Sequence, residues 1–549
     1  MKRNKKYFML LLVAILTVFM VMSGCSKKSS NEDSEKGSKS SNEDFILGET
    51  PLEYTMYGHY DWYTMPKWGE DLASKSIKEN KKVTVKPISS GGNAAQKFNT
   101  MIVANDLPDV IWMDRGPDVE KLREADMLVP LDDYIDKYPN LKKWAGESTL
   151  NMLRSSDGKI YQFPNWYTTQ PNGNAGYVVN DKIYKELGSP KLETTDDLYS
   201  YLKQVKEKYP DVVPFEPSIL ASSGFDILYS AFGEDHSGMF VGMRAVPQGD
   251  KLTSIFTDPV FRESMQYINK LYNEKLISQD ALTQTEDQVK EKIMTGRFAV
   301  YAESSPTTNA NVAHSVLKDG DPEAGLKMIW PIHKEGLDKD KIYTGSYNQL
   351  GWNVSVITKN AKNPEAIFAF LDYMTGPEGQ RDIFWGPEKL YWEGTQSVEG
   401  VDEAPIFTEA YLTDTKKRDE LMESTDGLQW VGNTVYIDNS KMAFEKSLPE
   451  EQQNWATRYQ SQITWKTQYN GTPFVNLNPM PESPEGITEQ RVNDIYDEAR
   501  AKAVYAKSAQ EVLDILDEAE KSAQAIGYDK LLEFKTKQWQ DNLKQMKGN

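Results

Sequence analysis

The residue types that usually carry catalysis or bind metals are present in this chain, but their spacing forms none of the common catalytic motifs. No G-x-S-x-G, H-E-x-x-H, Walker, G-x-G-x-x-G or EF-hand pattern occurs. The four histidines are far apart and give no short metal-ligand spacing; they are His59, His236, His314 and His333. The neighbouring acids Asp132 and Asp133 could serve glycoside hydrolysis, but in a chain with 82 acidic residues such a pair carries little information. We therefore expect no enzyme, no metal site and no cofactor.

The only cysteine, Cys25, ends the stretch Val-Met-Ser-Gly-Cys. Four basic residues within 2–6 precede an apolar run over 7–22, which is the order found in secretory signal peptides. The stretch resembles a bacterial lipobox, in which the cysteine is lipidated and becomes the mature N-terminus. We therefore predict a lipoprotein signal peptide over 1–24 and a protein anchored at the extracellular face of the cell membrane. The alternative is an uncleaved N-terminal anchor.

Composition indicates an acidic protein that is large enough for two or more domains. The 549 residues carry a net charge of −19, and cleavage before Cys25 removes four basic residues, so the mature charge is about −23. This charge disfavours nucleic acid as a partner. Residues 26–44 are almost entirely polar or charged, so we predict a disordered tether over 25–50. The 29 Tyr, 19 Phe and 13 Trp suit a site that stacks rings against a ligand.

The apolar pattern predicts strands alternating with helices. A β-α-β-α-β order at the start of the folded part indicates a parallel sheet covered by helices. Strands are predicted at 52–57, 82–88, 109–113, 177–180, 298–301 and 350–357, and helices at 66–79, 93–105, 195–208, 259–276, from 363 onward and over much of the last 60 residues.

Four segments, in this order, resemble the extracellular solute-binding proteins of ABC importers, in particular the sugar-binding group of the maltose-binding type. The segments are LPDVIWMD at 107–114, YQFP at 161–164 followed by YVVND at 177–181, KIMTGRFAVY at 292–301, and VSVITKNAKNPEA at 354–366 with DYMTGPEGQ at 372–380. The length of the chain resembles the large lipoprotein subgroup of Gram-positive bacteria. No further family motif follows residue 380.

The resemblance implies an α/β fold of the periplasmic-binding-protein type, with two lobes, a hinge and a ligand cleft between the lobes. The expected N-terminal lobe comprises 51–164 and 350–395, and the expected C-terminal lobe comprises 165–345 and 396–549. Such lobes close around a ligand by a hinge motion. The implied function is the capture of a carbohydrate, an oligosaccharide by preference, for delivery to the transmembrane subunits of an ABC permease. We expect a monomer.

Sugars present C–H faces that pack on aromatic rings and hydroxyl groups that need polar partners, so the resemblance directs attention to aromatic residues beside acids or amides. Each candidate has an alternative role: an exposed loop for Asp61 and Trp62, core packing for Trp112 and Trp385, and an ion pair with a helix acid for Arg115. The predicted ligand-binding residues are Asp61, Trp62, Trp112, Asp114, Arg115, Trp166, Glu303, Trp352 and Trp385.

Two other classes of protein remain open at this stage. One is an exported carbohydrate-active enzyme, which would release product from oligosaccharides. The other is a lectin that reports a sugar to a membrane sensor without feeding a permease.

Overall fold

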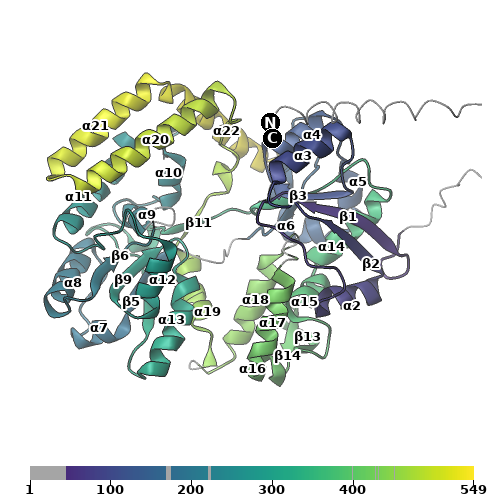
Figure 1. The fold of residues 1–549 in the computed structure, drawn as a ribbon, viewed down its shortest axis with the longest axis horizontal. Helices are drawn as coiled ribbons and strands as arrows, with labels where there is room; N and C mark the ends of the chain where they lie inside the picture. The colour runs from purple at the N-terminus through teal and green to yellow at the C-terminus, as the bar shows by residue number, and fades with distance from the viewer. Residues whose placement is uncertain are drawn as a thin grey trace, which may run out of the picture. The chain divides into compact units, whose positions relative to one another are not determined.

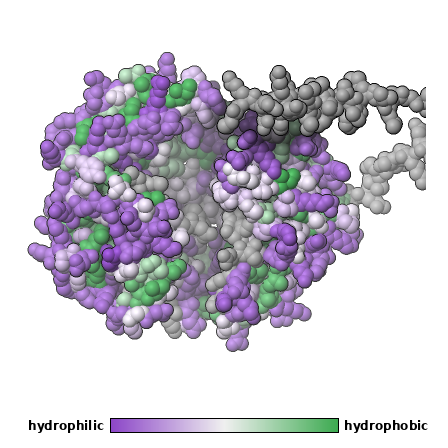
Figure 2. All heavy atoms as spheres, in the orientation of Figure 1, coloured by the Kyte–Doolittle hydropathy of each residue, from purple (hydrophilic) through white to green (hydrophobic). Residues whose placement is uncertain are grey.

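The computed structural model describes residues 45–168, 175–219, 224–398, 400–426, 428, 430, 432–449 and 452–548. The predicted signal peptide, Cys25 and the tether up to residue 44 lie outside these residues. Within the described part, no helix has both the length and the apolar character needed to cross a bilayer. Figure 2 shows that most side chains on the visible surface are hydrophilic, in agreement with the high content of charged residues.

A five-stranded sheet, here called the first sheet, has the strand order β2-β1-β3-β12-β4 (Figure 1). β1 pairs in parallel with β2 and β3, whereas β12 runs antiparallel to β3 and β4. The strands are β1 Leu52–Gly58, β2 Val83–Ile88, β3 Val110–Asp114, β4 Phe163–Asn165 and β12 Asn353–Ile357. The four strands predicted in this part of the chain are therefore confirmed, the last with a later start.

Helices cover both faces of the first sheet because its side chains alternate between two apolar faces. Phe98, Val119 and Leu122 bring α3 and α4 onto one face, while α2, α6 and α14 pack on the other. The helices are α2 Leu72–Lys81, α3 Ala94–Ala104, α4 Pro117–Glu124, α5 Asp132–Ile135, α6 Pro139–Met152, α14 Pro364–Thr375 and α15 Pro377–Trp385. The helix predicted from residue 66 begins later, because the carboxylate of Asp71 accepts the backbone N–H of Ser74 at 2.8 Å and caps it there.

A four-stranded sheet, the second sheet, has the order β10-β5-β9-β6. β6 and β9 are parallel, and β5 runs antiparallel to both β9 and β10. The strands are β5 Gly176–Asn180, β6 Val213–Glu216, β9 Phe298–Glu303 and β10 Leu326–Ile329. The elements between and around them are α7 Asp181–Glu186, α8 Thr195–Lys208, α9 Gly224–Ser230, α10 Gly238–Met243, β7 Ala245–Gln248, β8 Lys251–Ser254, α11 Pro259–Asn273, α12 Glu286–Met294 and α13 Pro306–Gly320.

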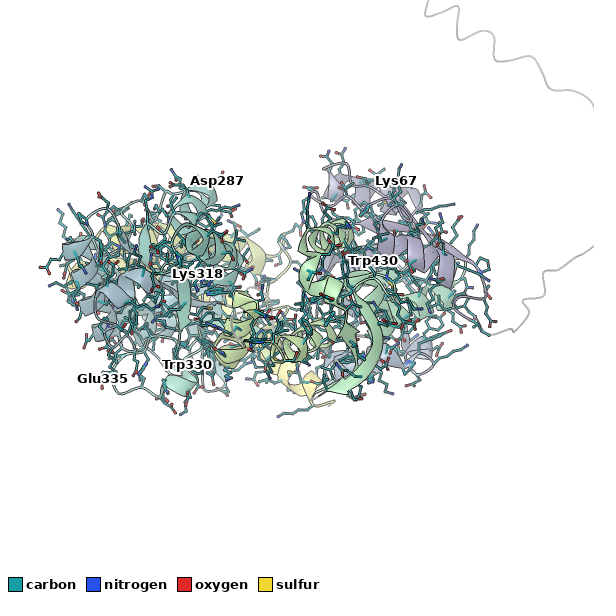
Figure 3. All side chains as sticks on the ribbon, turned by 90° about the horizontal axis from the view of Figure 1, so that it is seen from below. Lys67, Asp287, Lys318, Trp330, Glu335 and Trp430 are labelled. Atoms are coloured by element: carbon teal, nitrogen blue, oxygen red, sulfur yellow. The ribbon has the colours of Figure 1, made fainter. Side chains whose placement is uncertain are left out.

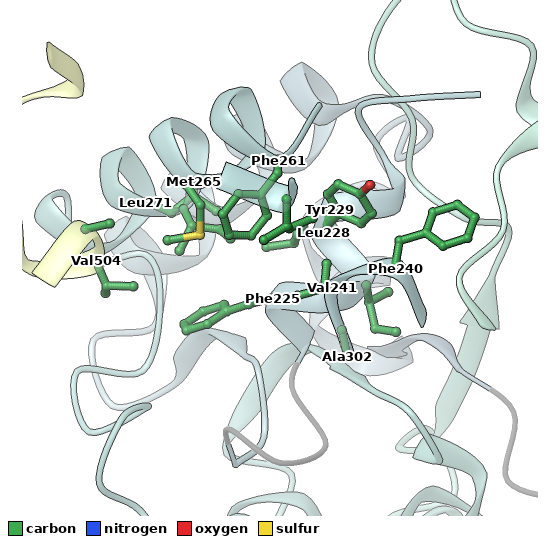
Figure 4. Packing of buried hydrophobic residues seen from close by; sticks show 14 of the residues in the cluster. Phe225, Leu228, Tyr229, Phe240, Val241, Phe261, Met265, Leu271, Ala302 and Val504 are labelled. Carbon is green, nitrogen blue, oxygen red and sulfur yellow. The ribbon is translucent and has the colours of Figure 1, made fainter. Parts of the chain in front are cut away.

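The largest apolar core lies between the second sheet and the helices on one of its faces. Figure 4 shows Phe261 and Met265 of α11 packed close to Leu228 and Tyr229 of α9. The predicted start of α11 is confirmed, because the Asp258 carboxylate accepts the Phe261 N–H at 2.9 Å. Side chains of the C-terminal helices complete this core.

Apart from β11, the remaining elements follow α15. A hairpin of β13 and β14 and the helices α16–α18 come first, then α19, a short strand β15 that pairs with β11, and three long helices. They are β11 Gly345–Tyr347, β13 Trp392–Val398, β14 Val401–Phe407, α16 Glu409–Thr413, α17 Thr415–Asp426, α18 Thr434–Glu445, α19 Trp455–Gln462, β15 Gln468–Asn470, α20 Pro484–Tyr505, α21 Ala509–Ala525 and α22 Tyr528–Met546.

By their contacts these elements fall into groups, and the assignment of 396–549 to the C-terminal lobe stays a prediction. α20 and α21 contact α11, a helix of the second sheet, whereas α22 contacts both β8 and α6 and so touches elements around both sheets. Residues 392–445 instead contact α15 and α2, which are helices of the first sheet. The prediction placed this segment by chain order alone, because no motif marks it. The exact lobe boundaries stay a prediction.

Candidate functional site

The carboxyl ends of β1 and β3 meet at one edge of the first sheet, because the two strands are parallel neighbours. β12 runs in the opposite direction, so its first residue, Asn353, lies opposite Asp114, the last residue of β3. This register brings three stretches together that are far apart in sequence: the loop after β1, the end of β3 and the residues before β12. In α/β folds this is the edge where ligands bind.

Five aromatic residues from these stretches form a continuous group, which we call the aromatic cluster; it consists of Tyr60, Trp62, Tyr63, Trp112 and Trp352. The ring centroids of Tyr60 and Trp112 are 4.6 Å apart, and Trp352 lies 5.6 Å from each of them. Trp112 has no exposed surface and forms the base, whereas Trp62 is 65% exposed and Trp352 is 40% exposed. Tryptophans with this much exposed surface, packed on a buried ring, are a platform for a flat apolar surface of a ligand.

Asp114 adds a carboxylate to the aromatic cluster. The Tyr60 hydroxyl donates a hydrogen bond to Asp114 Oδ1 at 2.8 Å, and the Asp114 side chain is exposed. Burial, and secondarily the hydrogen bond to Asp114, hold the pKa of Tyr60 well above its ordinary value. The phenol therefore remains a donor that orients the carboxylate, while the carboxylate can accept a further hydrogen bond from a ligand.

Arg115 contacts backbone and amide groups, and the predicted alternative of an ion pair with a helix acid is not what the structure shows. Its Nη2 donates to the carbonyl of Gly351 at 2.6 Å and its Nη1 to Asn476 Oδ1 at 3.3 Å. Burial lowers the pKa of Arg115 to about 10, although the nearby Asp114 acts in the opposite direction, so the guanidinium stays charged at neutral pH. Because Gly351 precedes Trp352, this contact positions one edge of the aromatic cluster.

Asp61 has a structural partner as well. Its Oδ1 accepts the backbone N–H of Ala94 at 2.6 Å, at the first residue of α3. The N-cap residue of that helix, Asn93, makes no such bond with its own side chain, so Asp61 takes over the capping role. Its contact with a ligand stays a prediction.

Trp166 and Trp385 lie in other surroundings. Trp166 is half-buried, packs edge-on against Phe384 with centroids 6.3 Å apart, and has a φ of +57°. Trp385 is fully buried and packs against Phe407. The sequence prediction of a ligand contact for Trp385 is therefore corrected: the stretch FWGPEKLYW forms the core beneath the β13–β14 hairpin, which was the alternative.

Glu303 belongs to a buried polar group at the carboxyl ends of β6 and β9, distinct from the aromatic cluster. Its carboxylate accepts hydrogen bonds from Ser218, at 2.7 Å, and from Tyr301. Burial raises the pKa of Glu303, although these two hydrogen bonds act against the shift. Nearby, Ser218 N–H donates to the fully buried Glu216, which also pairs with Lys292 at 3.0 Å.

Sequence reasoning did not assign a ligand role to Tyr60 or to the partners of Glu303. Tyr60 stands in the same stretch as Trp62, and its proximity to Trp112 follows from the pairing of β1 with β3. Tyr301 precedes Glu303 by two residues on β9, but Ser218 follows a different strand, β6, so no sequence spacing could have indicated that contact. Among the described residues, no group of three or more His, Cys, Asp or Glu side chains is arranged to hold a metal ion.

Comparison with known proteins gives a consistent picture. The family model described as bacterial extracellular solute-binding protein matches residues 69–381. A fructooligosaccharide ABC transporter substrate-binding protein, FusA of Streptococcus pneumoniae, is 28% identical over 319 residues, which cover 53% of this chain and 55% of FusA. The lipoprotein LipO of Bacillus subtilis is 26% identical over 392 residues, covering 69% of this chain and 72% of LipO. The match thus spans about half the length of FusA.

Solved structures share the fold at low sequence identity. The structure of FusA in complex with kestose covers 90% of this chain and 99% of its own chain, with a TM-score of 0.63 and 20% identity. The alginate-binding protein AlgQ2, solved without calcium ion, covers 90% of this chain and 98% of its own chain, with a TM-score of 0.62 and 18% identity. The predicted α/β fold of the two-lobed binding-protein type is confirmed by these matches.

Proposed function

The chain belongs to the family of bacterial extracellular solute-binding proteins, and we propose that it captures an oligosaccharide between two closing lobes and delivers it to the permease of an ABC importer. The observation that carries this proposal is the aromatic cluster with the Tyr60–Asp114 hydrogen bond at the edge of the first sheet. Exposed indole rings beside an oriented carboxylate match the two surfaces of a sugar, its C–H face and its hydroxyl groups.

The second half of the binding site would come from the second sheet. Parallel strands place the ends of β6 and β9 at one edge, where Ser218 and Glu303 lie. In the proposed mechanism a ligand first binds to the aromatic cluster, and closure of the lobes then brings this polar edge against its other face. The protein would act by a shift between open and closed populations.

The chemical class of ligand follows from the site and from the relatives. FusA is named for fructooligosaccharides, and the B. subtilis protein YtcQ, 22% identical to this chain over 380 residues, is named for polygalacturonan and rhamnogalacturonan. Fructooligosaccharides are neutral, whereas polygalacturonan and rhamnogalacturonan are acidic. We therefore define a saccharide panel of kestose, a galacturonan oligosaccharide and an alginate oligosaccharide.

We expect calorimetric titration to show binding of at least one saccharide of this panel to the wild type, and weaker binding to Trp62→Ala and Asp114→Ala. Loss of a stacking tryptophan or of a charged acceptor corresponds to about a tenfold to hundredfold lower affinity. Both side chains are exposed, so thermal melting should be nearly unchanged.

A matched control is Tyr505→Ala, which removes another exposed aromatic ring, 52% exposed on α20, that packs against Tyr272. This variant should bind as the wild type does. If the wild type binds no saccharide of the panel, the proposed function is wrong. If both site variants bind normally, the site assignment is wrong and the class of ligand stands.

We also propose that Cys25 carries a diacylglycerol anchor after removal of the signal peptide. The motif at 21–25 supports this, and more than one acyl chain is needed for stable attachment to a membrane. Cys25→Ala should leave the protein unprocessed or release it from the membrane fraction. Fractionation of cells expressing both forms checks this, and normal processing with unchanged membrane attachment of the variant would disprove it.

A further inference from the structure

Helix α18 lies outside the part of the chain that the family model matches, yet its first turn is joined to the stretch around Trp166. The Thr434 hydroxyl donates to the carbonyl of Tyr167 at 3.2 Å, and the backbone N–H of Trp166 donates to the carbonyl of Gly432 at 2.9 Å. Asn433 caps the helix by accepting the Tyr436 N–H at 3.2 Å. The start of α18 is therefore fixed to the segment that directly follows β4; α18 itself is labelled in Figure 1.

The position of Asp438 on α18 follows from helical spacing. Residues 434, 438 and 441 are separated by four and three positions and share one face of the helix. Lys441 Nζ lies 5.8 Å from the centroid of the Phe384 ring, and Trp166 packs on the same ring at 6.3 Å. Because Thr434 and Lys441 both contact the surroundings of Trp166, the residue between them, Asp438, faces the same region.

Burial of the Asp438 carboxylate costs desolvation free energy, and hydrogen bonds from the described residues do not fully compensate for it. Asp438 is 5% exposed, and its Oδ2 has no hydrogen-bond partner within the described part of the chain. Burial raises the pKa of Asp438 to about 7, and the charge of Lys441 only partly opposes the shift. A buried polar oxygen without a partner destabilises a fold by the full cost of its desolvation. Such a residue is expected where function requires it.

Trp166 shows independent signs of being held in place. Its φ of +57° lies in the left-handed region, which is unfavourable for a tryptophan. A Cβ at position 432 would lie 2.7 Å from the Trp166 ring, so only glycine leaves room for the indole. The backbone strain and the space next to Gly432 together fix the ring beside α18, and side chains held in this way are common at ligand-binding sites.

We propose that Asp438 is a ligand-contacting residue, and that its carboxylate accepts a hydrogen bond from a saccharide hydroxyl while the ring of Trp166 packs on the sugar. The inference rests on the proposed function and deepens it, because it adds α18 to the binding site. The occupant is a neutral hydroxyl group of a sugar, since a carboxylate acceptor would repel the acid group of a uronate.

The test uses Asp438→Asn with Asp372→Asn as its matched control. Asp372 is also a buried carboxylate, 2% exposed with a pKa raised by burial to about 6, but it accepts the N–H groups of Leu141 at 2.7 Å and of Asn140 at 3.2 Å. Its role is thus to cap α6. Calorimetry with the saccharide panel and thermal melting at pH 5 and pH 8 are measured on the full mature chain.

Asp438→Asn should bind saccharide at least about tenfold more weakly at pH 8 and should melt at a higher temperature than the wild type. The gain in melting temperature should be larger at pH 8 than at pH 5. A raised pKa in the folded state means that stability falls as pH rises from the unfolded value near 4 through the folded value of about 7, and the amide removes this loss. Among the charged groups, Lys441 acts on Asp438 directly and loses this charge partner in the variant, whereas Arg418 and Glu445 act on Lys441 and are still present.

Asp372→Asn should show the opposite behaviour, with a lower melting temperature and unchanged affinity. If Asp438→Asn binds as the wild type does, or melts at a lower temperature at pH 8, the inference is wrong. If the wild type binds no saccharide of the panel, the proposed function itself fails, which separates the two failures.

Discussion

Replacing Gly351 with alanine should prevent the formation of a stable native state, because one methyl group would have to occupy space that the backbone fills. A Cβ at this position would lie 1.6 Å from the carbonyl oxygen of Asn165 and 2.9 Å from the backbone nitrogen of Tyr167. Both contacts are with backbone atoms, so no side-chain rotation can relieve them. The φ of +70° adds a conformational penalty for any residue other than glycine.

The consequence reaches the proposed binding site. Gly351 accepts the hydrogen bond from Arg115 and precedes Trp352 of the aromatic cluster, so relief of the clash would move one edge of the cluster away from Trp112. We expect a loss of stability of at least about 4–5 kcal/mol, at the upper end of what single substitutions cause.

Gly91→Ala provides the control for the conformational part of this effect. Gly91 has a φ of +66°, is exposed, and has nothing within 4 Å of the place where a Cβ would lie. Its substitution should cost only about 1 kcal/mol. Thermal melting and saccharide titration of the two variants separate the penalty for a left-handed backbone conformation from the penalty for the steric clash. A Gly351→Ala protein that melts within a few degrees of Gly91→Ala would contradict the geometry given above.

The aromatic cluster shows which parts of the site the sequence could predict. Trp112 and Asp114 are two residues apart on β3, so they point to the same face, and the end of the strand could be read from the apolar run before them. Trp352 belongs to the same cluster only because β12 runs antiparallel to β3 with Asn353 opposite Asp114. This pairing joins residues about 240 positions apart, and only the family resemblance indicated it.

The failures have physical reasons too. Trp385 was a candidate as one of several aromatic residues in FWGPEKLYW, with core packing as its alternative role, and in the structure the hairpin of β13 and β14 and the ring of Tyr436 enclose it. Residues 392–445 carry no family motif, so their packing against α15 and α2 could not be anticipated. Asp438 belongs to this segment, and only the structure reveals its buried, unpartnered oxygen. Composition says nothing about a contact of this kind.

The second large effect on stability is expected from the buried ion pair of Lys292 and Glu216, which lies next to Glu303. Lys292 on α12 contacts Glu216 at 3.0 Å, Asp280 at 2.9 Å and Gln284 at 2.6 Å, and Glu216 has no exposed surface. Glu216 also accepts hydrogen bonds from the N–H of Ser218 and from Gln284. The cation thus neutralises a carboxylate that orients Ser218, and Ser218 in turn donates to Glu303.

Lys292→Met keeps the aliphatic part of the side chain and removes its charge. It should destabilise the protein by about 3–5 kcal/mol, because the loss of one partner leaves a buried charge without compensation. Lys290→Met on the same helix is the control: Lys290 is exposed, and the change should be nearly neutral. Thermal and urea unfolding monitored by circular dichroism measure both variants.

A double variant decides whether the buried charge is the cause. Lys292→Met combined with Glu216→Gln removes both charges and leaves an amide that can still interact with Ser218 and Gln284, so it should regain a substantial part of the lost stability. If the double variant is less stable than Lys292→Met alone, the ammonium acts through its other contacts, with Ser278, Asp280 and Gln284. If Lys292→Met unfolds at the same temperature and urea concentration as Lys290→Met, the ion pair contributes little to stability. The position of Ser218 and Glu303 at the edge of the second sheet must then depend on backbone packing alone.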